Sequence, residues 1–167
     1  MEVTLKSIMR LRPCYPYGRV RRLFKKGFTR ETLLGIPEAD AFWVLSGLLS
    51  PDKRVTWTKK CALIVATERV PRTVRNWLAG SSRNLTGREL QELIVLAINN
   101  TRGFHPEADA AYYSLRSAQQ RFHMDDPQSA VFLTASTSVG YSCSSGLPPE
   151  KAIGLALSLL KRQAPQR

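Results

Sequence analysis

Apolar side chains recur every three or four residues along most of this 167-residue chain, and this spacing is the strongest constraint on its fold. The clearest run lies in residues 38–49, with apolar side chains at Ala39, Phe42, Trp43, Leu45, Leu48 and Leu49. No stretch alternates apolar and polar residues for more than a few positions, as a half-buried strand would. The sequence therefore predicts an all-α protein, built as a multi-helix bundle.

Prolines, glycines and capping residues divide this pattern into segments. We interpret Pro51 as part of the stop after the first strong run, whereas Pro71 suits the first turn of a helix. Thr86 followed by Glu89 matches a capping box and predicts another helix start. The expected helices span residues 19–26, 38–49, 56–67, 71–78, 86–98, 106–122, 128–143 and 149–162.

Positive charge is concentrated in the first two thirds of the chain. The net charge is +12, and residues 1–102 hold 19 Lys and Arg against 8 Asp and Glu. Residues 103–167 hold only 6 against 5. A charge of this size predicts a polyanionic partner such as DNA, RNA or an anionic membrane surface. We expect the binding surface to lie within the first hundred residues.

The first 30 residues are the most basic stretch, with Glu2 as their only acid. Pro13 and Pro16 interrupt any helix here, because proline lacks the amide donor and restricts the residue before it. One interpretation is a solvated, flexible arm. The other is an arm whose arginines hold phosphates while Tyr15 and Tyr17 stack on bases, and the sequence leaves both open.

Residues 62–80 contain the most informative motif. Val74, Trp77 and Leu78 share one helix face and can pack against the preceding Ala-rich helix. This segment, with the run Thr73, Val74, Trp77 and Gly80, resembles the helix-turn-helix of the phage-repressor-like DNA-binding family. The resemblance covers residues 38–100. It implies that the second helix of the motif enters the DNA major groove.

The opposite face of that helix carries residue types that read base edges. Arginine pairs with guanine and asparagine with adenine in the major groove. The candidate base-reading residues are Arg72, Thr73, Arg75 and Asn76. Basic residues on the arm and around the motif would contact phosphates and fix the register. These candidates are Arg19, Arg21, Arg22, Lys25, Lys26, Lys59, Lys60, Arg69, Arg83 and Arg88.

The chain departs from the family pattern in the turn. The family usually has a glycine there and one more residue before the threonine, whereas this chain reads Glu68-Arg69-Val70-Pro71-Arg72. We therefore expect a reshaped or shortened turn. The alternative interpretation is that residues 71–79 form an ordinary amphipathic helix of the bundle, with its arginines on a solvated face.

The change in charge near residues 99–103 predicts a division into three parts. These are a basic arm (1–37), a helix-turn-helix-like unit (38–102) and a three-helix region for packing or self-association (103–167). The last region is rich in Ala and Ser, which permit close helix packing, and we assign Gly140 and Gly154 the same role. It also offers a surface for a protein partner.

The sequence does not predict an enzyme. His105 and His123 lie outside any metal-ligand spacing, Asp125 and Asp126 resemble the start of a helix, and no phosphate-binding glycine loop is present. The three cysteines form neither a metal motif nor a disulfide framework. We expect no cofactor and no metal. With no signal peptide or membrane span recognised, we expect a cytoplasmic protein.

These observations favour a sequence-specific DNA-binding protein, such as a transcriptional regulator of phage, plasmid or bacterial type. A homodimer is expected because such proteins usually read two half-sites. Two alternatives stay open. One is a non-specific RNA- or DNA-binding protein, with DNA favoured over RNA because no RNA-module signature is found. The other is a protein–protein interaction module, since the C-terminal third is similar in composition to helical immunity proteins of bacterial toxin systems.

Overall fold

The computed structural model describes residues 3–11, 16–25, 27–80, 85–99, 105–122 and 128–161. Within these ranges the chain forms α-helices, one turn of 3-10 helix and no strand, which confirms the all-α prediction. The 3-10 turn, η1 (Gln120–Phe122), directly follows α8. The α-helices are α1 (Leu5–Arg10), α2 (Tyr17–Leu23), α3 (Arg30–Leu34), α4 (Glu38–Leu48), α5 (Pro51–Val65), α6 (Arg72–Ala79), α7 (Gly87–Ile98), α8 (Pro106–Gln119), α9 (Gln128–Ser144) and α10 (Pro149–Lys161).

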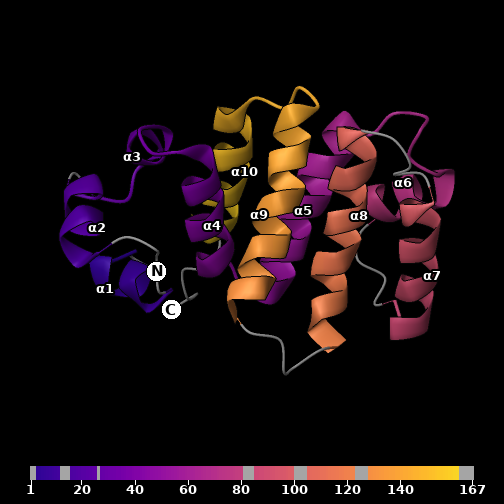
Figure 1. The fold of residues 1–167 in the computed structure, drawn as a ribbon, viewed down its shortest axis with the longest axis horizontal. Helices are drawn as coiled ribbons and strands as arrows, with labels where there is room; N and C mark the ends of the chain where they lie inside the picture. The colour runs from indigo at the N-terminus through magenta and orange to yellow at the C-terminus, as the bar shows by residue number, and fades with distance from the viewer. Residues whose placement is uncertain are drawn as a thin grey trace.

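The helices are arranged in a row along the longest axis of the molecule (Figure 1). α1 and α2 lie at one end, and α6 and α7 lie at the other. Between them stand α4, α10, α9, α5 and α8, which run across the long axis. The two most basic parts of the sequence therefore belong to opposite ends of the protein.

α5 lies between two apolar clusters and contributes to both. Trp57 and Cys61 belong to the first cluster, which also contains buried residues of α1 to α4, α9 and α10. Val55 and Ala62 belong to the second cluster, with buried residues of α6, α7 and α8. The indole Nε1 of Trp57 donates to the carbonyl oxygen of Ala152 at 2.9 Å, which joins α5 to α10. Burial on both sides makes α5 the central helix of the fold.

Small residues let α8 and α9 pack closely, as the Ala- and Ser-rich composition predicts. The hydroxyl of buried Ser138 donates to the carbonyl oxygen of Ala110 at 2.9 Å, and Ser114 donates to Thr58 at 3.0 Å. Gly140 and Gly154 do not serve this purpose, because a Cβ atom at either position would meet no heavy atom within 4 Å.

The predicted boundary at residues 102 and 103 does not separate two cores. α9 packs against α4 and α5 as well as against α8, so the C-terminal third completes the cores begun by earlier helices. The helices of this weakly charged third, α8, α9 and α10, stand in the middle of the row (Figure 1).

The first third of the chain differs from the sequence-based assignment at α1 and α3, which were not predicted, and at the start of α5. Pro51 occupies the first turn of α5, where its missing amide costs nothing, so it begins that helix five residues before the predicted start. The predicted arm is folded rather than extended: Ile8, Val20 and Leu33 are at most 1% exposed within the first cluster. α3, which holds Leu33, was not predicted.

Candidate nucleic-acid interface

α5 and α6 are consecutive helices that pack against each other, and a loop joins them. α6 begins after Pro71, which is extended, and ends at Gly80, whose amide donates to Asn76 at 2.9 Å. Val74 and Leu78 are buried in the second apolar cluster. Their spacing of four residues places both on the inner face of α6. The predicted helix and its inner face are confirmed.

The loop between α5 and α6 contains a backbone hydrogen bond of its own. Residues 66–71 separate the two helices, and the amide of Val70 donates to the carbonyl oxygen of Thr67 at 3.1 Å. The Val70 side chain is fully buried and anchors the loop in the second cluster.

Three of the four candidate base-reading residues lie on the outer face of α6. Arg72, Thr73 and Asn76 are exposed, so their polar groups are accessible to a ligand. Arg75 is half-buried, and its Nε atom is buried without a hydrogen-bond partner in the described part of the chain. The structure therefore presents Arg72 and Asn76 one helical turn apart, with Arg75 set deeper beside them.

Lys59 occupies a different place from the one expected of a phosphate contact. It is 7% exposed, and its Nζ atom donates to the carbonyl oxygen of Gly80 at 2.9 Å. The same ammonium lies 4.5 Å from the centre of the Trp77 ring. Lys59 thus holds α6 against α5 and does not present its charge to the surface. Its neighbour Lys60 is exposed.

Arg69, which precedes α6 in the sequence, and Arg88, which follows it, are both exposed. Arg88 lies on α7 and forms an exposed salt bridge with Glu92 at 3.3 Å. Such a surface pair is worth little, so Arg88 can exchange it for a phosphate. Two of the candidate phosphate contacts, Lys26 and Arg83, lie outside the described residues.

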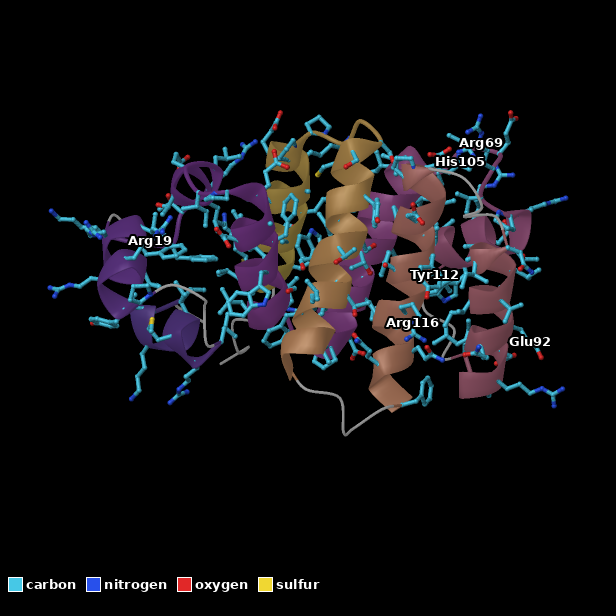
Figure 2. The ribbon with its side chains drawn as sticks, viewed as in Figure 1. Arg19, Arg69, Glu92, His105, Tyr112 and Arg116 are labelled. Atoms are coloured by element: carbon cyan, nitrogen blue, oxygen red, sulfur yellow. The ribbon has the colours of Figure 1, made fainter. Side chains whose placement is uncertain are left out.

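Arg69 is held by a residue that sequence reasoning did not connect to the motif. Its Nη1 atom lies 2.7 Å from Nδ1 of His105, at the start of α8, and Figure 2 shows the two side chains together above α6. Arginine can only donate, so Nδ1 accepts in this arrangement. Thr67 of the same loop donates to Glu107 of α8 at 3.4 Å. Because 36 residues separate Arg69 from His105, no local pattern signals this contact.

The remaining described basic candidates form a separate surface on α2 and just after it. Arg19, Arg21, Arg22 and Lys25 are all exposed, while Val20 on the inner side of α2 is buried. α2 and α6 lie at opposite ends of the long axis (Figure 1). Lys60, Arg69 and Arg88 therefore lie on the helices and the loop next to α6 in the sequence, and the basic residues at α2 belong to the other end of the molecule.

Comparison with protein-family models, with curated proteins and with solved structures gives no match to this chain. None of the helices in the described ranges combines the length and the apolar character that a membrane crossing requires. The arrangement around α6 is thus interpreted from its own geometry.

Proposed function

We propose that this chain is a sequence-specific DNA-binding protein, a transcriptional regulator that reads the major groove with α6. One observation carries the proposal: α6 buries Val74 and Leu78 and exposes Arg72, Thr73 and Asn76 on its other side. Arginine and asparagine supply the bidentate hydrogen bonds that distinguish guanine and adenine. A rigidly held helix with this outer face fits a groove about 12 Å wide.

Phosphate contacts follow from the exposed basic residues around α6. Lys60, Arg69 and Arg88 lie on the helices and loop next to it, where they would orient the helix without reading sequence. The cationic residues of α2 are a second, separate place for polyanion contact. In this proposal the protein acts in the cytoplasm.

We further propose that the protein binds DNA as a homodimer through the outer side of α7. Val95 and Leu96 are 46% and 43% exposed, which gives the C-terminal half of α7 two neighbouring apolar side chains on its outer side. α7 packs against α6, so pairing of two such surfaces would set the distance between two reading helices. Dimeric proteins of this type read half-sites about 34 Å apart.

The test is selection of preferred duplexes from a random pool, followed by titration of the selected and a scrambled duplex at two salt concentrations. We expect the wild-type protein to prefer the selected duplex. Arg72→Ala or Asn76→Ala should lower that preference by about 1–3 kcal/mol. Arg88→Ala should weaken binding to both duplexes alike and reduce the salt dependence, because it removes a phosphate contact.

Arg21→Ala is the matched control, since Arg21 is exposed on α2 at the far end of the molecule. It should leave the sequence preference unchanged. Equal affinity for all duplexes with steep salt dependence would instead identify a non-specific nucleic-acid binder. No binding at moderate salt would favour a protein-interaction module. Sedimentation of Val95→Glu should show loss of the dimer, and a wild-type monomer with and without DNA would refute dimerisation.

A further inference from the structure

A cleft of about 670 Å³ lies between α2 and the pair formed by α4 and α9. Its walls include Leu23 and Phe24 from α2, Trp43 from α4, and Gly140 and Tyr141 from α9. A volume in this range, with mostly apolar and aromatic walls, is typical of sites for small organic molecules. Of the helices that line the cleft, α2 lies at the opposite end of the molecule from α6, and α4 and α9 stand between them (Figure 1).

The charged side chains that line the cleft are acidic, whereas the protein as a whole is basic. Among its described lining residues, the charged ones are Glu38 and Asp40, both in the first turn of α4. None of the Lys and Arg residues that the structure describes lines it, although the chain has a net charge of +12. Aromatic rings and carboxylates are the two groups that attract an organic cation, by cation–π contact and by charge pairing.

Gly140 makes the cleft deeper at its α9 wall. A Cβ atom built on Gly140 would meet no heavy atom within 4 Å, so the glycine leaves open space where another residue would place its side chain. Glycine inside a helix is destabilising by roughly 0.5–1 kcal/mol relative to alanine, and close packing does not account for it here. Gly140 differs from Gly154, which has the same free space, in that it lines the cleft.

We propose that this cleft binds a small organic cation with an aromatic body. The inference stands on the cleft alone and does not require that α6 binds DNA. If both hold, the cation is an effector that occupies the end of the molecule opposite the reading helix.

The test is isothermal titration of the full-length protein with tetraphenylphosphonium and with tetraphenylborate, which have the same shape and opposite charge. We expect one tetraphenylphosphonium per chain and weaker binding of tetraphenylborate. Non-specific attraction to a chain of net charge +12 would give the reverse order. The double variant Glu38→Gln with Asp40→Asn should weaken cation binding about tenfold or more.

Two matched controls separate cleft binding from other effects. Glu31→Gln with Asp52→Asn removes two carboxylates that do not line the cleft, and should leave the affinity unchanged. Gly140→Leu should fill the cleft and abolish binding, whereas Gly154→Leu on α10 should not, and circular dichroism establishes that each variant folds. Stronger binding of tetraphenylborate, or cation binding that survives both Gly140→Leu and the double carboxylate variant, would overturn the proposal.

Discussion

The ammonium of Lys59 donates to the carbonyl oxygen of Gly80 at 2.9 Å, and so joins the middle of α5 to the residue that ends α6. The Trp77 ring lies beneath the same ammonium, 4.5 Å away. A strongly hydrated charge is costly to bury unless it is well paired, so this geometry replaces water with a carbonyl and an aromatic face. It fixes the position of α6 on α5, and the proposed reading of a groove by α6 depends on that position.

We expect Lys59→Met to lower the free energy of unfolding by about 1–3 kcal/mol, because Gly80 loses its donor and the ring contact disappears. Lys60→Met is the matched control. Lys60 is exposed, so its replacement should change the free energy by less than about 0.5 kcal/mol. Urea unfolding followed by circular dichroism measures both. Equal effects of the two variants would show that the buried contact does not stabilise the protein.

Arg54 has a comparable role at the end of α4. Its Nε and Nη2 atoms donate to the carbonyl oxygens of Ser46 and Leu49 at 2.7 and 3.1 Å, and burial lowers the pKa of its guanidinium to about 10. The group is still protonated at neutral pH. We expect Arg54→Met to lower the free energy of unfolding by about 2–3 kcal/mol, because two carbonyls lose a charged donor. Thermal unfolding should show a much smaller change for Arg22→Met at an exposed site.

Two glycines should respond to alanine in opposite directions. Gly154 lies inside α10 with free space at its Cβ position, so Gly154→Ala should raise the free energy of unfolding by about 0.5–1 kcal/mol. Gly146 follows α9 with a φ of 101°, and its amide donates to Cys143 at 3.0 Å. Gly146→Ala should be destabilising by about 1–2 kcal/mol, since a Cβ atom is strained in this conformation. Chemical denaturation of the two variants measures both changes in the free energy of unfolding. Changes of the same sign would contradict the prediction.

Short sequence motifs predict a helix correctly where its start or its buried face is set by residues a few positions apart. Thr86 accepts from the amide of Glu89, and Glu89 accepts from the amide of Thr86, so the capping box fixes the start of α7 as expected. The inner face of α6 was predictable for the same reason, because Val74 and Leu78 show it at a spacing of four residues. Pro51 was misread because a proline near the end of one helix is equally suited to begin the next.

Contacts between distant parts of the chain could not be predicted in this way. Lys59 and Lys60 are adjacent in the sequence, and no local pattern indicates which of them is buried. Lys59 is buried because its ammonium binds the carbonyl oxygen of Gly80, 21 residues further along the chain. The same holds for His105, which meets Arg69 only in the folded protein. The candidate base-reading face was thus accessible to pattern analysis, whereas the groups that position it were not.

Asp109 offers a test through pH. It lies near the start of α8, and burial raises the pKa of its carboxyl group, with an opposing effect from His105 and a further increase from Glu107. A carboxyl group whose pKa is higher in the folded state than in the unfolded state favours folding when protonated. That contribution is complete below the unfolded pKa of about 3.9 and is lost as the pH rises through the folded value.

We therefore expect Asp109→Asn to be more stable than the wild-type protein at pH 7, because the amide keeps the shape without the buried charge. The advantage should shrink as the pH falls through the acidic range and vanish below about pH 3.9. Thermal unfolding of both proteins between pH 3 and pH 7 measures this difference. Asp52→Asn, at an exposed first-turn position of α5, should give no such gain. If Asp109→Asn is less stable than the wild type at pH 7, the ionised carboxylate stabilises α8 more than its burial costs.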